Sequence, residues 1–160
     1  PGPERLEALG AAYGLSCAQR ARLADACARW FASATCAETR AWKLRRAEVP
    51  FGVEVGGALM EGEIDLLCTD GPDLGGARAL VVDYKTGGSD DELPEALRGK
   101  HLLQAQCYAY ALLSQGCAEV ELRFARVEHA DPGDVQTVRY RFAAADRDGL
   151  AASIMQARGA

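Results

Sequence analysis

The apolar run ALVV (79–82) leads directly into two charged residues, Asp83 and Lys85. Four consecutive apolar residues do not alternate with polar ones, so both faces of this short segment need cover. Such a run is typical of a central strand in a sheet that has helices on both sides. The glycine pair 87–88 then begins a loop. The run therefore predicts an α/β domain with a buried strand at the centre of its sheet.

The other segments predict helices and strands that complete this domain. Residues up to about 40 carry an apolar stripe at helical spacing around Trp30, and from about residue 44 the period becomes two. The expected elements are a helical lead-in (1–40), strands near 44–55, 58–68 and 79–86, a helix (94–114), strands near 120–128 and 135–142, and a helix (144–158). The order α-β-β-β-α-β-β-α predicts one α/β domain with a central mixed sheet flanked by helices.

Alternation also predicts which side chains share a face of the second strand. The glycine pair 56–57 indicates a hairpin turn before it. The strand then places Ile64, Leu66 and Cys68 on one face. Asp65 is expected on the opposite, polar face of the hairpin.

Composition restricts the kinds of partner and site. The 160 residues are 49% hydrophobic and 26% charged, as in a soluble globular domain, and no run of about 18 apolar residues indicates a membrane span. The net charge of −5 argues mildly against binding nucleic acid by bulk electrostatics, although basic residues cluster locally. The six cysteines include no C-x-x-C pair, and we expect reduced core cysteines in a cytoplasmic protein. With two histidines, a Cys/His zinc site is not expected.

Asp83 and Lys85 are two residues apart on the predicted central strand, so their side chains project from the same face. Tyr84 points to the opposite face. If the preceding strand pairs with this one, Asp65 and Asp83 converge within one metal coordination sphere. Carboxylate oxygens at that spacing favour Mg²⁺ or Mn²⁺. The alternative is an Asp83–Lys85 ion pair that only stabilises the strand end.

A second pair of polar side chains lies on the helix that follows. Gln104 and Tyr108 are four residues apart, so they occupy one helix face. An amide and a phenol in this arrangement can bond phosphate oxygens or orient a metal-bound carboxylate. The alternative is an amphipathic helix whose polar residues face solvent.

Taken together, these segments resemble a known family. G-E-I-D (62–65), V-V-D-Y-K-T (81–86) and Q-A-Q-C-Y (104–108) occur in the order of the G-x-x-D strand, D-Y-K strand and Q-x-x-x-Y helix of RecB/AddA-type nucleases. These nucleases form part of the PD-(D/E)xK superfamily. R-A-E-V-P-F (46–51) is similar to the strand that opens their sheet. The resemblance covers about residues 42–128 and implies a restriction-endonuclease-like core.

The resemblance also implies roles for individual residues. Asp65 and Asp83 would be metal ligands, joined by the backbone carbonyl of Tyr84. Lys85 would position or activate the attacking water and stabilise charge in the transition state. The implied cofactor is Mg²⁺ or Mn²⁺. An iron–sulfur cluster is not expected, because the cysteine cluster of the family's iron–sulfur variants is missing from the sequence.

Further residues are implied with less specific roles. Gln104 and Tyr108 would brace the site or grip the DNA backbone. Glu48 is an auxiliary candidate on the polar side of its strand, and a cross-strand salt bridge is the alternative for it. No G-x-x-x-x-G-K-[ST] motif is present, so no nucleotide site is expected in this chain.

Histidine is where the sequence departs from the family pattern. Such nucleases usually carry a metal-binding histidine, often as G-x-x-x-H, in a helix upstream of the sheet. Neither His101 nor His129 occupies that place. We expect His101 on the helix surface and His129 near a turn. Either the chain begins after that helix or the site has lost a ligand.

The resemblance implies a Mg²⁺-dependent, exonuclease-type deoxyribonuclease that works in double-strand-break processing and recombinational repair. The expected partners are single-stranded DNA fed by a helicase domain of the same parent chain, and a second helicase-nuclease subunit. Residues 1–160 would then be one domain cut from a longer chain, with a core at 42–128 and a strand and helix at 134–160. The alternative is an inactive nuclease-like module for DNA or subunit docking. A restriction or Holliday-junction nuclease would leave the Q-x-x-x-Y helix unexplained.

Overall fold

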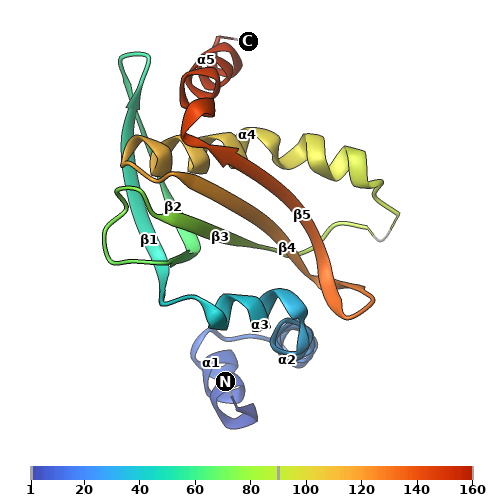
Figure 1. Cartoon of the computed structure of the whole chain (residues 1–160). Coiled ribbons are helices and arrows are strands. Elements are labelled where there is room, and N and C mark those ends of the chain that lie inside the picture. Colours follow the sequence, from blue (N-terminus) through green and yellow to red (C-terminus); the bar gives the residue numbers. More distant parts are fainter. Residues whose placement is uncertain (1, 90, 160) are drawn as a thin grey trace.

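The computed structural model describes residues 2–89 and 91–159, so Pro1, Asp90 and Ala160 lie outside the described residues. The element order confirms the predicted one, with the helical lead-in divided into three helices (Figure 1). The elements are α1 (Pro3–Ala12), α2 (Cys17–Ala32), α3 (Ala34–Ala41), β1 (Leu44–Val55), β2 (Ala58–Thr69), β3 (Arg78–Lys85), α4 (Pro94–Ser114), β4 (Glu119–Asp131), β5 (Asp134–Ala143), a 3₁₀ turn (Ala144–Asp146) and α5 (Arg147–Arg158).

The five strands form one mixed sheet in the order β1-β2-β3-β4-β5. β3 is the central strand, antiparallel to β2 and parallel to β4. A parallel pair needs a crossover connection, which the 21-residue helix α4 provides. Residues 79–83 of β3 are all buried, as predicted from the apolar run. The end of β3 is therefore the point at which the chain leaves the sheet and crosses to α4.

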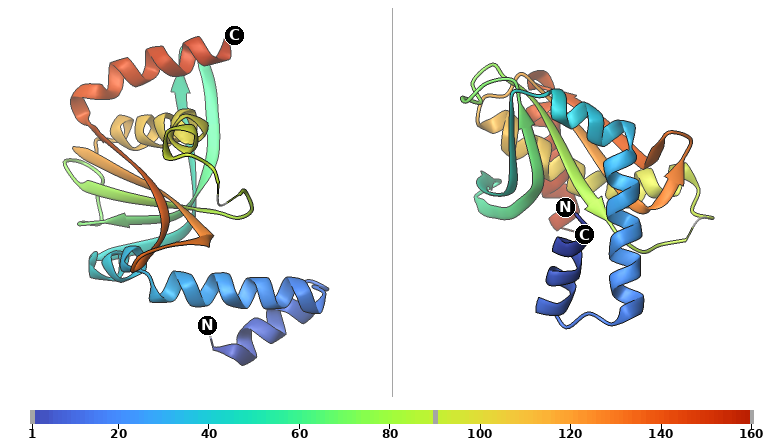
Figure 2. Two further views of the ribbon diagram at one scale, coloured as in Figure 1. Left: turned by 90° about the vertical axis from the view of Figure 1, so that its right-hand side faces the viewer. Right: turned by 90° about the horizontal axis from the view of Figure 1, so that it is seen from below.

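Helices cover both faces of the sheet (Figure 2). On one face, α4 and α5 pack on a core that includes Leu67, Val81 and Phe124. On the other, α2 and α3 pack on a smaller core that includes Trp30 and Val82. Alternate residues of β3 thus enter different cores, as the alternation of a strand requires.

The lead-in helices are delimited by serines. Ser16 begins α2 with a capping box, in which its hydroxyl accepts from the Gln19 amide and the Gln19 side chain accepts from the Ser16 amide. Ser33 ends α2 and caps α3, accepting from the Cys36 amide. α1 packs against α2 and lies on the side of α2 that is away from the sheet (Figure 2).

The β1–β2 hairpin contains an irregularity that alters the predicted faces. Regular pairing stops at Ala47↔Leu66 and resumes at Val49↔Ile64. Between them Glu48 has a φ of 52°, a left-handed conformation that is uncommon for a residue other than glycine.

This irregularity overturns one expectation. Ile64 packs in the core on the α4 side, whereas Leu66 and Cys68 pack on the α2 side, so the three do not share a face. Leu67 lies on the α4 side, and alternation places Asp65 with it. The strand pattern was wrong for Ile64 because the pairing of β1 with β2 is interrupted between Glu48 and Asp65, and the alternation of faces changes there. Asp65 still lies on the face opposite Leu66 and Cys68, as expected.

All six cysteines are free thiols. Cys36, Cys68 and Cys117 are buried, as expected of core cysteines, but Cys17 is exposed at the start of α2. Within the described ranges, no helix has the length and apolarity needed to cross a membrane.

Candidate active site

The end of β3 carries a buried ion pair. Lys85 Nζ lies 2.7 Å from Asp83 Oδ1, and the Asp83 side chain is only 5% exposed. Apart from this ion pair, Oδ1 is a buried oxygen that accepts no hydrogen bond. The ion pair that we considered as the alternative to a metal site therefore exists, but it leaves one oxygen of Asp83 with a free acceptor position.

Helix α4 supplies the partners of the other carboxylate oxygen. Gln104 Nε2 donates to Asp83 Oδ2 at 2.9 Å, and the Tyr108 hydroxyl lies 3.0 Å from the same atom. Gln104 Oε1 in turn accepts from Lys85 Nζ at 2.9 Å. Gln104 and Tyr108 therefore face the site from one side of α4, and neither points to bulk solvent.

Tyr108 also ties this network to β2. Its hydroxyl lies 3.1 Å from the backbone carbonyl of Glu63, and Gln104 Nε2 donates to the hydroxyl at 2.8 Å. One hydroxyl proton serves either Asp83 or Glu63 at a time. Burial, together with the charge of Asp83, raises the pKa of the Tyr108 phenol, so the phenol remains a donor at neutral pH.

Asp65 joins the site from β2. Its Oδ2 accepts from the backbone amide of Tyr84 at 2.7 Å. Partial burial raises the pKa of the Asp65 carboxyl, the negative charges of Asp83 and Glu48 add to the rise, and the hydrogen bond from Tyr84 opposes it. Asp65 is therefore held close to Asp83 on the adjacent strand, and the two carboxylates repel each other.

Glu48 lies beside another acid. A hydrogen bond with Glu63, and then the charge of Glu63, raise the pKa of the Glu48 carboxyl. Among the described residues, Glu48 does not form the cross-strand salt bridge that we considered, and its neighbour Glu63 is acidic rather than basic. Glu63 was not predicted as a site residue. The alternating acids of E-G-E (61–63) were the only sequence signal for it.

The raised pKa of Asp65 predicts that Asp65→Asn stabilises the metal-free protein. A carboxyl whose pKa is higher in the folded state loses folding stability as the pH rises from about 4 through that folded-state pKa. The asparagine has no such charge, so the melting temperature of the variant should exceed that of the parent at pH 7 and match it more closely near pH 4. Thermal unfolding in EDTA measures this.

Glu61→Gln, on the same strand, is the matched control, because Glu61 is an exposed carboxylate that contacts none of the candidate site residues. A variant Asp65→Asn with a lower melting temperature at pH 7 would contradict the crowding of carboxylates at this site.

The comparison with known families agrees with this geometry. A model of the PD-(D/E)XK nuclease superfamily matches residues 3–158. The chain belongs to this superfamily. No curated protein matches the chain in sequence. The solved structures that resemble it include the crystal structure of SSO0001, at 20% identity and a TM-score of 0.37 over 70% of this chain. The chain spans half the length of that structure.

PD-(D/E)XK nucleases generally use divalent metals such as Mg²⁺. The oxygens of Asp65 and Asp83 are the hard ligands that Mg²⁺ prefers, and the buried Asp83 Oδ1 has an acceptor position to spare. In residues 2–89 and 91–159, no group of three or more His, Cys, Asp or Glu side chains is arranged to hold a metal ion. The residues present fit a cation that takes two carboxylates and completes its sphere with backbone oxygen and water.

His101 differs from the expectation of a surface position. It is only 8% exposed, and its ring stacks on Phe124 with centroids 4.9 Å apart. Positions 101, 104 and 108 follow helical spacing, so His101 lies on the same inward face of α4 as Gln104. Burial and the nearby cationic Lys85 lower the pKa of His101, which keeps it neutral at pH 7.

His129 was expected near a turn, and it lies in the last part of β4 as a buried residue. Its Nε2 is 2.9 Å from the carbonyl oxygen of Gly87. Glu128 accepts from the Gly87 amide at 2.6 Å. β4 thus fixes the first glycine of the loop that follows the site lysine.

Proposed function

We propose that this chain is a metal-dependent deoxyribonuclease domain of the RecB/AddA type. The observation that carries the proposal is the bonding of the Asp83–Lys85 pair by Gln104 and Tyr108. A pair that only stabilised the strand end would not need two further polar side chains, each from the motif helix. The order of the strand and helix motifs in the sequence supports the same subfamily.

In this proposal Asp65, Asp83 and the carbonyl of Tyr84 hold Mg²⁺ or Mn²⁺. A divalent cation held there would supply Lewis-acid chemistry, which polarises a phosphate and lowers the pKa of water. Lys85 positions the attacking water and offsets negative charge on the phosphate in the transition state. Gln104 fixes the orientation of both Lys85 and Asp83, because it bonds to each of them.

Glu48 and Tyr108 have supporting roles. Tyr108 bonds to Asp83 Oδ2, so Oδ1 would be the oxygen of Asp83 left to hold a cation. Glu48 adds negative charge near Asp65, which favours a cation there. Both residues act through the carboxylates rather than on the substrate.

The test is cleavage of labelled single-stranded and double-stranded DNA by the chain. We expect cutting with Mg²⁺ or Mn²⁺, no cutting in EDTA, and recovery when excess Mn²⁺ is added to the EDTA-treated protein. Cutting that continues in EDTA would contradict the metal-dependent mechanism.

A second candidate is a nuclease-fold module that binds DNA or a subunit without cutting it. The limited set of side-chain ligands among the described residues favours this candidate. DNA binding without cleavage in either metal would support it and would contradict the nuclease proposal for this chain.

We further propose that residues 1–160 act as one domain of a longer helicase-nuclease, with the core at 42–128 and an added strand and helix at 134–160. A helicase domain would supply single-stranded DNA, a second subunit would assist, and the role would be repair of double-strand breaks. The coding sequence upstream of Pro1 tests this proposal. Helicase motifs and a G-x-x-x-H helix support it, whereas a start codon adjoining Pro1 contradicts it.

A further inference from the structure

A cavity of about 370 Å³ lies at the end of β3 on the α2 side of the sheet. Trp30 and Phe31 of α2 form one wall, Tyr84 and Thr86 form another, and Val127 of β4 completes it. Its volume is at the small end of the range for ligand pockets, which start at about 300 Å³. Its lining is mostly apolar and includes three aromatic rings.

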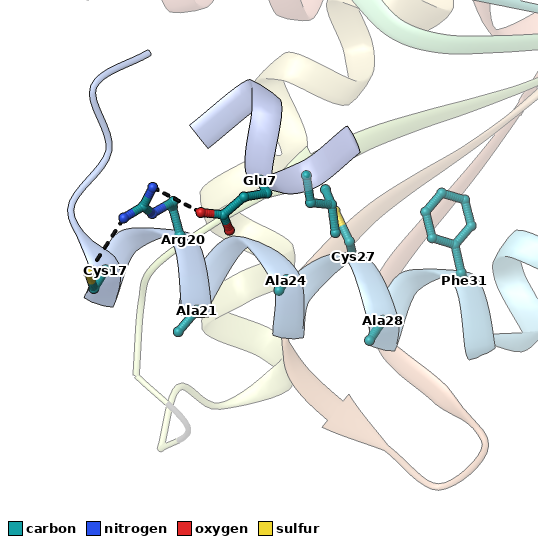
Figure 3. Close-up of a pocket in the computed structure, with 9 residues that line it drawn as sticks. Glu7, Cys17, Arg20, Ala21, Ala24, Cys27, Ala28 and Phe31 are labelled. Carbon is teal, nitrogen blue, oxygen red and sulfur yellow. Dashed lines mark hydrogen bonds and ion pairs between the residues drawn. The ribbon is translucent and has the colours of Figure 1, made fainter. Parts of the chain in front are cut away.

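The three rings differ in exposure: Trp30 and Tyr84 pack against each other, and Phe31 is accessible to solvent. Trp30 meets Tyr84 edge to face, with centroids 4.9 Å apart and an interplanar angle of 81°. Phe31 is 43% exposed, and its ring stands off α2 at the end of the helix distant from Cys17 (Figure 3). An exposed aromatic ring beside a buried aromatic pair suits a flat, aromatic ligand, which gains by stacking.

The cavity lies across β3 from the candidate active site. Tyr84 lies between Asp83 and Lys85, so the cavity and the site occupy opposite faces of one strand end. Consecutive Cα atoms are about 3.8 Å apart. A chain-like ligand that passes around the end of β3 can therefore place a phosphate near Lys85 and an attached group in the cavity.

Two arginines contact residues of the cavity lining. Arg29 donates to the carbonyl of Val127 at 2.8 Å, and the Arg40 guanidinium lies 5.8 Å from the centre of the Phe31 ring. Neither arginine forms a salt bridge with an acidic side chain of the described residues. In a chain of net charge −5, two arginines without acidic partners beside an aromatic cavity favour an anionic ligand.

The larger groove between α1 and α2 shares Cys27 and Phe31 with this cavity. It has a volume of about 700 Å³, and Phe31 is the one aromatic ring in its lining (Figure 3). Arg20 in this groove is already paired with Glu7 at 3.2 Å. With one ring and a paired arginine, the groove gives less reason to expect an aromatic anion than the cavity beside Tyr84.

We propose that the cavity beside Tyr84 binds an unpaired nucleobase of the strand whose phosphate lies in the active site. The proposal rests on the proposed nuclease function and deepens it by assigning a site for one base of the single-stranded substrate. Stacking on aromatic side chains tolerates any base, because every base has a π-face. The cavity would then select for unpaired strands without reading their sequence.

The test compares two labelled single strands of equal length, one with bases and one built of abasic units. Fluorescence anisotropy in EDTA measures binding without cleavage. We expect the strand with bases to bind roughly tenfold more tightly, since one stacked base contributes about 1–3 kcal/mol. Phe31→Ala should remove most of that difference and leave abasic binding unchanged, and Phe31→Trp should restore it.

Tyr13→Ala is the control, because Tyr13 is a 78% exposed aromatic residue outside the cavity lining. Equal affinity for the two strands, equal effects of Phe31→Ala and Tyr13→Ala, or no binding of either strand would each overturn the proposal. Equal affinity would leave the cavity to a protein occupant. Cleavage in Mn²⁺ is measured separately, so cutting without base-dependent binding rejects the pocket alone, and base-dependent binding without cutting rejects the nuclease alone.

Discussion

Asp83→Asn is expected to lower the rate of DNA cleavage by about 10²-fold or more, because it removes a charged metal ligand. The asparagine has nearly the same shape, and its oxygen can still accept from Gln104 and Tyr108. The fold should therefore be retained, and the loss should appear in the initial rate of cleavage in Mg²⁺ rather than in the circular dichroism spectrum.

Asp70→Asn is a suitable control for this variant. Asp70 follows β2 and accepts from the amide of Arg78, which is at the opposite end of β3 from Asp83, at 3.1 Å. It should leave the rate unchanged. Undiminished cleavage by Asp83→Asn would place the chemistry elsewhere in the chain.

Lys85→Ala is expected to reduce both cleavage and stability. The variant lacks the ammonium charge that positions water, and we expect the rate of cleavage to fall by about 10²-fold. It also leaves the buried Asp83 carboxylate without its ion pair, and such a loss costs about 3–5 kcal/mol. Because Lys85 is 27% exposed and water can partly replace it, the lower end of that range is expected in urea unfolding.

Two further measurements test the prediction for Lys85→Ala more specifically. Mg²⁺ should restore part of the lost stability of Lys85→Ala, since a cation can compensate Asp83. The double variant Asp83→Asn, Lys85→Met should recover stability in EDTA but not cleavage, because it removes both buried charges together. A single variant Lys85→Ala as stable as the parent in EDTA would contradict the importance of the buried pair.

Local patterns predicted much of the fold and of the candidate site. The apolar run before Asp83 identified the central strand, because a strand with both faces covered has no polar alternation. The four-residue spacing of Gln104 and Tyr108 placed them on one face of α4, and the structure brings both to Asp83. These features depend on spacing within one element, which the sequence displays directly.

Features that depend on contacts between elements could not be predicted in the same way. The facing of Ile64 and Leu66 was wrong because the left-handed conformation of Glu48, on another strand, interrupts their alternation. His101 was expected at the surface, yet it stacks on Phe124 of β4. The spacing of residues within a single helix carries no information on which strand that helix packs against.

The hydrogen bond between Asp65 Oδ2 and the Tyr84 amide gives the site a spectroscopic reporter. The amide proton of Tyr84 is held by a side-chain carboxylate, so its chemical shift and its rate of exchange with deuterium depend on the charge of that carboxylate. Protonation of Asp65, or binding of a cation to it, would therefore be visible at one backbone resonance. A titration of the ¹⁵N-labelled protein with Mg²⁺ could follow occupancy of the site without any substrate and independently of catalysis.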